Sequence, residues 1–211
     1  MNALAKKNDK RPELPPALPE FAHINRYWDK TRDMPAAKIL PGQLYVTLKD
    51  ELITTVLGSC VAACIRDRKF GIGGMNHFML PEGGVEGTGE AARYGVFAME
   101  SLINAILKNG GRRAHLEVKL FGGGQVMPGM SDVGRRNIQF ARCFVRSEGL
   151  RVTAEDLGGP WPRKVVYFPA SGKVLVKKLE SLHNDTLVAR ERSYYQDLNQ
   201  GPVAGEIELF D

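Results

Sequence analysis

The sequence is short of cysteine. Cys60, Cys64 and Cys143 are its only three cysteines in 211 residues. So small and odd a number in a chain of this length does not describe a disulfide framework. Cys60 and Cys64 are separated by three residues, and no second cysteine pair or nearby histidine pair completes a zinc site. We therefore expect reduced thiols, a cytoplasmic protein and no metal.

Long hydrophobic runs are missing as well. No apolar stretch approaches the roughly 18 residues that are needed to cross a bilayer. The 43% hydrophobic content is still ordinary for a soluble protein with a core of normal size. The basic residues near the N-terminus, between Lys6 and Arg11, precede no apolar stretch, which argues against a secretory signal. The sequence therefore predicts no membrane insertion.

Concentrated charge of one sign is also absent. Lys and Arg number 29 against 24 Asp and Glu, a net charge of +5. The basic residues are dispersed in pairs such as Arg112–Arg113 and Arg135–Arg136. No recognition helix, RNP-like motif or zinc finger accompanies them. We therefore expect a solvated basic surface with a mild preference for anionic partners, and no nucleic-acid binding.

Composition divides the chain into three segments. Residues 1–38 include four closely spaced prolines between Pro12 and Pro19 amid charged residues, which is typical of an extension that resists regular structure. The apolar residues between Phe21 and Trp28 have the spacing of a short helix that could dock on the domain. Residues 39–182 form the expected domain, and residues 183–211 form a polar tail.

Apolar periodicity predicts a strand-rich body. Strands are expected where apolar residues run or alternate, and helices where they recur every three or four positions. The expected strands are 43–48, 52–57, 61–66, 71–80, 115–121, 151–156, 165–168 and 174–179. The expected helices are 91–108 and 132–147. Because strands outnumber helices and short turns join many of them, including a hairpin at 169–172, we expect a mixed α/β domain rather than a doubly wound one.

The segment around Cys60 carries the strongest chemical signal. Cys60 follows Gly58-Ser59 between two strand-like runs, which places it at a bend where its thiol can project into a cleft. Neighbouring backbone N–H groups stay free at such a bend, and free N–H groups near a nucleophile are what an oxyanion hole requires. The N–H groups of Ser59 and Cys60 are the candidates.

A thiol also needs a base to become a thiolate near neutral pH. His77 lies in an apolar strand that could pair beside Cys60. The other three histidines fall in the extension, at the start of a strand and near the polar tail, so His77 is the best-placed base. A lone cysteine is usually a small buried hydrophobe, and a lone histidine is usually structural. Spacing alone therefore leaves the catalytic and the structural interpretations open.

Several other residues carry weaker signals. Gly122–Gly124 could line the cleft or simply end a strand, and no Gly-Lys-Ser/Thr follows to make a phosphate loop. Cys64 falls in a strand and Cys143 in a helix, and both are expected in the core. Asn76 and Ser59 flank the two candidates and are possible site residues.

A series of short motifs extends from about Ile39 to Leu179. In order they are Thr54, Leu57-Gly58-Ser59-Cys60-Val61, Gly73-Gly74-Met75-Asn76-His77-Phe78-Met79-Leu80-Pro81, Lys119-Leu120-Phe121-Gly122-Gly123, Gly134-Arg135-Arg136-Asn137, Glu155-Asp156-Leu157-Gly158-Gly159, Arg163-Lys164-Val165 and Ser171-Gly172-Lys173-Val174. This series closely resembles the signature of the CheD family of chemoreceptor glutamine deamidases. A lone Gly-Ser-Cys would be weak, whereas the ordered series is specific.

The resemblance implies a fold similar to the catalytic domain of the cytotoxic necrotizing factor toxins, with two packed β-sheets flanked by helices. It also implies a Cys-His-Thr triad, which carries over to Cys60, His77 and Thr54. Thr54 is selected over Thr55 because the family's threonine lies six residues before the cysteine. In an extended strand Thr54 would share a face with Gly58, and its hydroxyl would orient the imidazole.

The implied activity is that of a protein-glutamine glutaminase, which hydrolyses a glutamine side chain to glutamate and releases ammonia without a cofactor. The implied substrate is the cytoplasmic helical bundle of methyl-accepting chemotaxis receptors, where deamidation creates methylation sites. The adaptor phosphatase CheC is a partner of some family members. Two alternatives stay open: a non-catalytic receptor-binding or adaptor module of the chemotaxis system, and a cysteine protease or amidase with another substrate.

Overall fold

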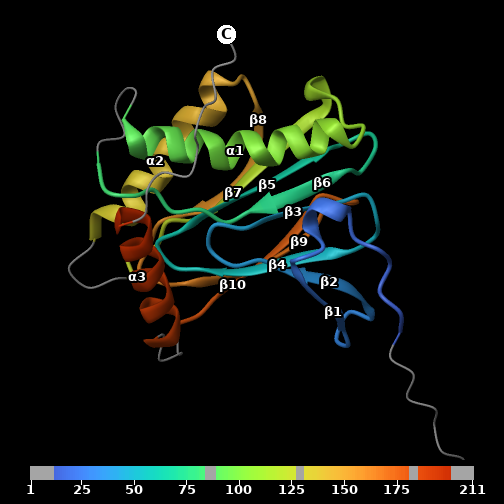
Figure 1. Cartoon of the computed structure of the whole chain (residues 1–211), viewed down its shortest axis with the longest axis horizontal. Helices are drawn as coiled ribbons and strands as arrows, with labels where there is room; N and C mark the ends of the chain where they lie inside the picture. The colour runs from blue at the N-terminus through green and yellow to red at the C-terminus, as the bar shows by residue number, and fades with distance from the viewer. Residues whose placement is uncertain (1–11, 84–88, 127–130, 181–184, 201–211) are drawn as a thin grey trace, which may run out of the picture.

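The computed structural model describes residues 12–83, 89–126, 131–180 and 185–200 (Figure 1). The strands of this part of the chain form two five-stranded sheets. The first, which we call the β4 sheet, has the order β1 (Asn25–Asp29), β2 (Met34–Lys38), β4 (Leu52–Leu57), β9 (Arg163–Phe168) and β10 (Lys173–Lys178). Its neighbours are antiparallel except for the parallel pair of β2 and β4.

The second sheet, the β5 sheet, packs against the first. Its order is β3 (Leu44–Thr47), β6 (Gly73–Asn76), β5 (Val61–Asp67), β7 (Leu116–Gly122) and β8 (Arg151–Leu157). Here too one pair is parallel, that of β7 and β8. The prediction of a mixed fold with two packed sheets flanked by helices is confirmed.

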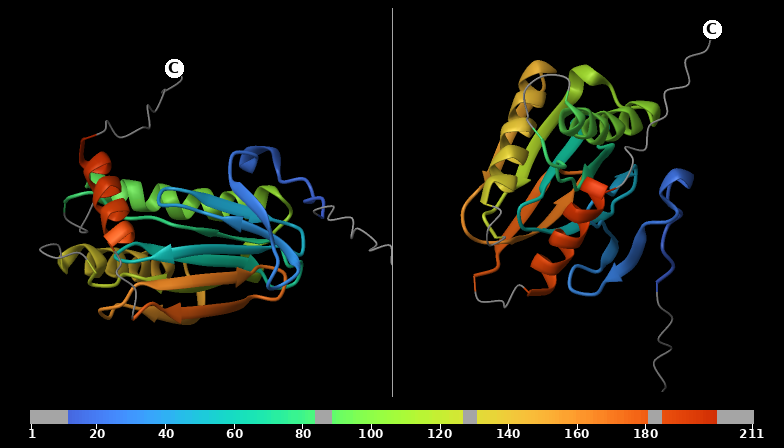
Figure 2. Two further views of the ribbon diagram at one scale, coloured as in Figure 1. Left: turned by 90° about the horizontal axis from the view of Figure 1, so that it is seen from below. Right: turned by 60° about the vertical axis from the view of Figure 1, so that its left-hand side comes forward.

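Two long helices cover the face of the β5 sheet that points away from the β4 sheet. These are α1 (Glu90–Lys108) and α2 (Ser131–Ser147), and Figure 2 shows both on one side of the strands. Each buries one stripe of apolar side chains at helical spacing. The buried residues are Met99, Leu102, Ile103 and Ile106 of α1 and Phe140, Ala141, Phe144 and Val145 of α2. None of the helices in the described ranges is long and apolar enough to cross a membrane.

This layering explains the continuous apolar run of β5. The strand has helices on one face and the β4 sheet on the other, so all side chains from Val61 to Ile65 are buried. Strand β4 instead divides its residues between two clusters. Ile53 and Leu57 belong to the main core between the sheets, and Leu52 belongs to a separate small cluster.

The third helix, α3 (Asp185–Gln200), lies across one end of the two sheets and is drawn in red in Figure 1. The sequence predicts a polar tail over residues 183–211, and the structure forms this helix within it. Most of its described side chains are exposed or half-buried, which is why its composition reads as polar. Residues 201–211 of the predicted tail lie outside the described residues.

The predicted boundary at residue 38 is wrong. Strands β1 and β2 precede it and belong to the β4 sheet, because β2 pairs with β4 from Ala36 to Lys38. The short helix expected across Phe21 to Trp28 is also absent from this described segment. A 3-10 turn ends at Phe21, and β1 begins at Asn25. Phe21 and Ile24 nevertheless dock on the core, as their apolar character suggested.

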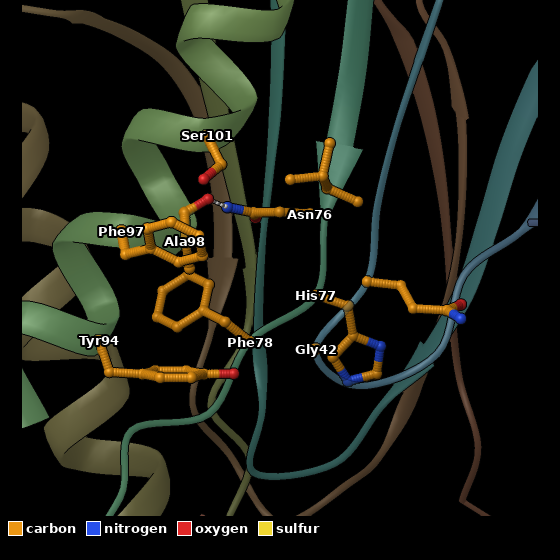
Figure 3. A pocket seen from close by; sticks show the side chains of 10 residues that line it. Gly42, Asn76, His77, Phe78, Tyr94, Phe97, Ala98 and Ser101 are labelled. Carbon is orange, nitrogen blue, oxygen red and sulfur yellow. Dashed lines mark hydrogen bonds between the residues drawn. The ribbon is translucent and has the colours of Figure 1, made fainter. Parts of the chain in front are cut away.

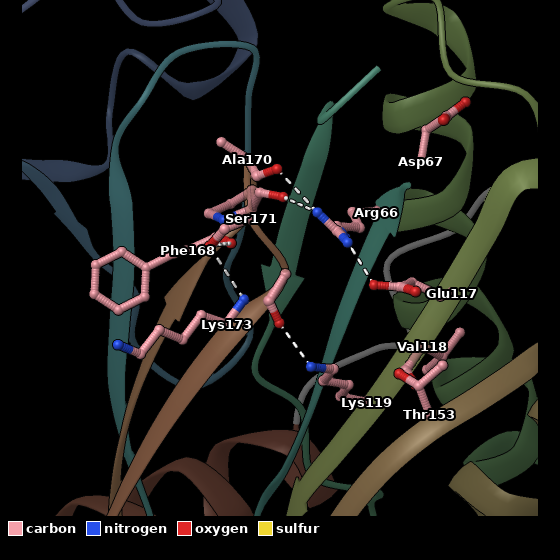
Figure 4. A network of polar contacts seen from close by, with 12 residues as sticks. Arg66, Asp67, Glu117, Val118, Lys119, Thr153, Phe168, Ala170, Ser171 and Lys173 are labelled. Atoms are coloured by element: carbon pink, nitrogen blue, oxygen red, sulfur yellow. Dashed lines mark hydrogen bonds and ion pairs between the residues drawn. The ribbon is translucent and has the colours of Figure 1, made fainter. Parts of the chain in front are cut away.

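A polar network joins the two sheets at the end of β5 that lies away from Cys60 (Figure 4). The Arg66 side chain donates to Glu117 Oε1 at 2.7 Å and to Ala170 O at 2.9 Å, so it links β5, β7 and the turn between β9 and β10. Lys119 Nζ donates to Gly172 O in the same turn at 2.7 Å. These contacts tie β5 and β7 of one sheet to the turn between β9 and β10 of the other.

Candidate active site

Cys60 lies in a tight connection between the two sheets. Strand β4 ends at Leu57 and β5 begins at Val61, so Gly58–Cys60 cross from one sheet to the other. All three carbonyls of this bend, the nucleophile loop, accept hydrogen bonds from the rest of the protein. These bonds are Gly124 N to Gly58 O at 2.7 Å, Asn137 Nδ2 to Ser59 O at 2.8 Å and Gly123 N to Cys60 O at 2.7 Å.

The three N–H groups of the nucleophile loop all point at the carboxylate of Glu191. Gly58 N and Ser59 N lie 2.8 Å from its two oxygens, and Cys60 N lies 3.4 Å from one of them. The Ser59 hydroxyl donates to the same carboxylate at 2.7 Å. Converging backbone N–H groups beside a nucleophile form an anion site of the kind that stabilises a tetrahedral oxyanion.

The glycines at the end of β7 hold this loop. Gly122 has φ of +110°, and a Cβ there would lie 2.1 Å from Cys60 O. Only glycine permits both the positive φ and this approach. Gly122–Gly124 therefore end a strand, one of the two alternatives expected, and the N–H groups of Gly123 and Gly124 hold two of the three loop carbonyls.

His77 follows β6 directly and is held by its backbone. Its N–H donates to Gln43 O at 2.9 Å, and its carbonyl accepts from Gly42 N at 2.8 Å. The residue is only 1% exposed, so the imidazole is almost fully buried. Figure 3 shows the imidazole beside Gly42, beyond the end of the strand that carries Asn76.

A hydroxyl fixes the tautomer of this imidazole. Thr55 Oγ1 lies 2.8 Å from His77 Nδ1 and 2.9 Å from Ile39 O. A carbonyl can only accept, so the Thr55 hydroxyl donates to Ile39 and must accept from Nδ1–H. The proton is thus placed on Nδ1, and Nε2 carries the free lone pair. Nε2 is buried and has no hydrogen-bond partner among the residues that the structure describes.

The thiol of Cys60 lies close to this imidazole. Cys60 Sγ, a ring nitrogen of His77 and a carboxylate oxygen of Glu191 all lie within 4.8 Å of one another. A thiol, a base with an unoccupied lone pair and an anion site therefore meet at one point. This is the set of groups that nucleophilic attack on an acyl or amide carbon requires.

Comparison with known proteins connects this site to a family. A family model described as CheD chemotactic sensory transduction matches residues 79–178. A curated protein of Halorhodospira halophila is 56% identical over 204 residues, which cover 93% of this chain and 94% of that protein. One from Janthinobacterium sp. is 59% identical, with 90% of this chain and 97% of that protein covered. Both are named probable chemoreceptor glutamine deamidase CheD. The chain belongs to the CheD family.

The match to CheD proteins extends along the whole chain. A relative from Saccharophagus degradans with the same name is 48% identical over 100% of both chains. A crystal structure of a Neisseria meningitidis protein is 10% identical, covers 59% of this chain and 64% of that one, and has a TM-score of 0.37. That likeness is too low to carry an argument.

The threonine carried over from the CheD signature does not reach the histidine. Thr54 Oγ1 donates to Val165 O at 2.9 Å, on the neighbouring strand of the β4 sheet. Thr54 shares its face with Leu52, whereas Thr55 shares the inward face with Ile53 and Leu57. The expectation for Thr54 assumed that the face extends to Gly58, but the strand ends at Leu57 and the chain bends there.

The electrostatics of the site describe a resting state. Burial, followed by the negative charge of Glu191, raises the pKa of the Cys60 thiol well above its usual range. Burial, followed by the positive charge of Arg190, lowers the pKa of His77 to about 3. The structure therefore holds a neutral thiol beside a neutral imidazole.

Two hollows reach His77 from opposite sides. One lies against α1 and is lined by residues that include Gln43, Asn76 and Phe97 (Figure 3). The other lies beneath α3 and is lined by residues that include Thr55 and Arg190. Cys60 lines neither and has no exposed surface.

The three converging groups are also spaced as metal ligands could be. Both oxygens of Glu191, however, already accept hydrogen bonds from N–H groups of the nucleophile loop. A cation in this position would face the positive ends of those N–H dipoles. The donor set therefore fits an anion, and we assign no metal to it.

The remaining candidates have structural places. Asn76 accepts from Ala63 N at 2.8 Å and donates to Ala98 O at 2.9 Å, so it joins β5, β6 and α1. Cys64 is buried in the core, as expected. Cys143 is exposed, so its predicted place in the core is wrong. It lies on the outer side of α2, between buried positions of the helical stripe.

Two residues of the site had no assigned role in the sequence analysis. Asn137 belongs to one of the CheD motifs, and its buried amide holds Ser59 O and accepts from Leu80 N at 2.8 Å. Glu191 belongs to the polar C-terminal segment. No local signal identifies it, because its partners lie more than 130 positions earlier in the chain.

Proposed function

We propose that this protein deamidates glutamine side chains of methyl-accepting chemotaxis receptors to glutamate, in the cytoplasm, as part of chemotactic adaptation. The observation that carries the proposal is the convergence of the Cys60 thiol, the His77 ring and the N–H groups of the nucleophile loop. Nε2 of that ring has no partner within the described part of the chain. The names of the CheD relatives support the choice of a receptor glutamine as the substrate. Cys60 and His77 are the catalytic residues that we propose.

The first step is the formation of the nucleophile. His77 Nε2 takes the thiol proton, while Thr55 accepts from Nδ1–H and stabilises the resulting imidazolium. We propose Thr55 for this positioning role in place of Thr54. The thiolate then attacks the carboxamide carbon. The resulting oxyanion is held by the N–H groups of the nucleophile loop.

The tetrahedral intermediate collapses when imidazolium His77 donates its proton to the leaving nitrogen. The C–N bond breaks, ammonia leaves, and a thioester joins the substrate carbonyl to Cys60. His77 then takes a proton from water, whose oxygen attacks the thioester. The C–S bond breaks, glutamate is released, and the Cys60 thiolate takes back the proton from His77. The sum is the conversion of one carboxamide and one water to one carboxylate and one ammonium ion.

Purified protein and a receptor cytoplasmic fragment provide the test. We expect ammonia release with the wild type and none with Cys60→Ala, while His77→Ala lowers the rate by at least roughly a hundredfold. The receptor fragment must keep its full length. A shortened fragment indicates a protease, and tight binding without ammonia indicates the adaptor module. Ammonia release by a folded Cys60→Ala protein would overturn the mechanism.

The family resemblance also supports a CheC-like adaptor phosphatase as a second partner. Co-purification of such a protein with this chain tests the pairing, and its failure leaves the deamidase proposal unaffected.

A further inference from the structure

The anion site beside Cys60 is filled by the protein itself. Glu191 has no exposed surface, although it projects from a helix whose side chains are otherwise mostly exposed or half-buried. Its carboxylate accepts four hydrogen bonds from the nucleophile loop. All three loop N–H groups are therefore occupied, and a substrate carbonyl oxygen has no donor left to bind.

The chain is built to admit this carboxylate. A Cβ at Gly58 would lie 2.6 Å from Glu191 Oε2 and 2.5 Å from a methyl carbon of Val126. The backbone of the loop can therefore approach the carboxylate only because residue 58 is glycine. No described cationic side chain forms an ion pair with Glu191. Its charge is balanced by backbone dipoles, as it would be for a bound product.

We propose that α3 is an intramolecular product mimic: Glu191 occupies the position of the product carboxylate, and α3 must leave before a substrate glutamine can enter. The analogy with a reaction product rests on the proposed deamidation. The occupancy of the anion site by Glu191 does not depend on it. The occupant is a glutamate side chain on a helix, and glutamate is what the proposed reaction produces.

The hydrogen bonds select a carboxylate over a carboxamide. Gly58 N donates to one oxygen of Glu191 and Ser59 N to the other. A glutamine at position 191 would have to turn its NH₂ group toward one of these N–H donors and would lose that bond. Glutamate therefore seats α3 more firmly than glutamine would, and Glu191→Gln is a conservative way to release the helix.

The seated helix also keeps the catalytic pair inactive. The carboxylate beside Cys60 adds to the effect of burial and raises the pKa of the thiol. Arg190, the neighbouring residue on α3, adds to the effect of burial and lowers the pKa of His77. Departure of α3 removes both charges and admits water, so it favours the thiolate and the imidazolium together.

The rest of α3 is attached along one face only, where half-buried Val188, Tyr194 and Leu198 pack against the main core. Among the described residues of the helix, Tyr195 is the only other buried one, and its hydroxyl accepts from Arg136 at 3.1 Å. Tyr194 shares a hydrogen bond of 2.5 Å with Tyr94, and Asn199 accepts from Glu82 N at 2.6 Å. Because most of the described side chains of α3 are exposed and no strand pairs with it, we expect the helix to dissociate without unfolding the sheets.

The first experiment measures the accessibility of Cys60. Full-length protein in a Cys143→Ser background is treated with iodoacetamide, and alkylation of Cys60 is followed by site-resolved mass spectrometry. We expect Glu191→Gln to be alkylated at least about tenfold faster than the parent, because a charge-assisted hydrogen-bond set is lost. Asp197→Asn, which removes an exposed carboxylate from the same helix, serves as the matched control and leaves the rate unchanged.

Glu191→Gln could speed alkylation by changing the reactivity of the Cys60 thiol without releasing the helix. A second variant separates these two effects. Tyr195→Ala keeps Glu191 but removes the buried contact of α3, and circular dichroism shows whether the sheets stay folded. We expect faster alkylation of Cys60 in this variant also. Equal alkylation rates for the parent, Glu191→Gln and Tyr195→Ala would overturn the proposal.

The second experiment measures ammonia release from a receptor fragment. Displacement of an internal competitor predicts that Glu191→Gln lowers KM severalfold, with Asp197→Asn unchanged. If Glu191→Gln speeds alkylation but no variant releases ammonia, the occupancy of the site by α3 stands and the proposed deamidation fails. If the wild type releases ammonia and neither KM nor alkylation responds to Glu191→Gln, the deamidation stands and the product mimic is wrong.

Discussion

The hydroxyl of Thr55 and Nδ1 of His77 lie 2.8 Å apart, and this contact determines which imidazole nitrogen can act as a base. The same hydroxyl donates to the carbonyl of Ile39, which leaves its lone pair for Nδ1–H. Nε2 is consequently the unprotonated nitrogen. Thr55 therefore has a positioning role that depends on its hydroxyl group.

Replacement of that hydroxyl is the first prediction. Thr55→Val keeps the shape of the side chain and removes the hydrogen bond to His77. We expect kcat to fall by at least about tenfold, but by less than the roughly 10⁴-fold that follows removal of a charged third member from a serine-protease triad. Steady-state ammonia release from a receptor fragment provides the measurement.

The adjacent threonine is its matched control. Thr54→Val removes a hydroxyl that donates to Val165 O within the β4 sheet. We expect a loss of about 1 kcal/mol in the free energy of unfolding and no change in kcat. The reverse outcome, with kcat reduced by Thr54→Val alone, would restore the assignment that the family resemblance suggested.

Acid stability is the second prediction. Burial, followed by the charge of Arg190, lowers the pKa of His77 to about 3, whereas the unfolded chain titrates near 6.5. Between these values the unfolded state binds a proton that the folded state does not. The free energy of unfolding therefore falls as the pH drops from about 6.5 toward 3, by at most about 1.4 kcal/mol per pH unit for this one group.

Urea unfolding at a series of pH values tests this contribution. His77→Gln removes the titrating group, so the dependence of its unfolding free energy on pH is expected to be flatter in the same window. Parallel curves for the wild type and His77→Gln would show that His77 is not held neutral in the folded protein.

The third prediction concerns the anchor of the nucleophile loop. Asn137→Ala leaves Ser59 O and Leu80 N without their buried partner. We expect a loss of roughly 1–3 kcal/mol for each unpaired group and a reduced kcat, because the loop N–H groups lose their orientation. Asn25→Ala, at an exposed position of β1, is the control and should change neither quantity. Unchanged activity in a folded Asn137→Ala protein would contradict this role.

The fourth prediction compares two glycines of positive φ. A Cβ at Gly122 would lie 2.1 Å from Cys60 O, whereas a Cβ at Gly149 would meet nothing within 4 Å. Gly149→Ala therefore carries backbone strain alone, of order 1 kcal/mol. Gly122→Ala must in addition displace the nucleophile loop, and we expect a larger loss of stability together with loss of ammonia release. Equal effects of the two substitutions on the thermal unfolding temperature would argue against the close approach of Gly122 to the nucleophile loop.

Much of the fold could be predicted from apolar periodicity. Strand β5 and helices α1 and α2 were expected almost at their observed bounds, because each buries its apolar residues in the pattern that its geometry requires. The parallel pairing of β2 with β4 was not predictable in this way. It depends on contacts between segments that composition had assigned to an extension and to the domain.

The site was predictable where its signals are local. Cys60 and His77 are brought together as expected. Thr55 rather than Thr54 contacts His77, because the strand ends at Leu57 and its faces do not continue to Gly58. The large apolar residues Ile53 and Leu57 mark the inward face of β4, and they place Thr55 there. Glu191 could not be predicted, because a buried carboxylate on a polar helix has no periodic signal of its own.

The most direct test of the central claim is site-resolved mass spectrometry of a receptor co-expressed with this protein. The mass spectra show whether each receptor glutamine is still an amide or has become glutamate. The comparison uses cells that carry the wild-type protein, the Cys60→Ala variant or neither. We predict specific glutamines converted to glutamate on an uncut receptor with the wild type, and only amides in the other two. The same conversion with Cys60→Ala, or no conversion with the wild type, would contradict the account.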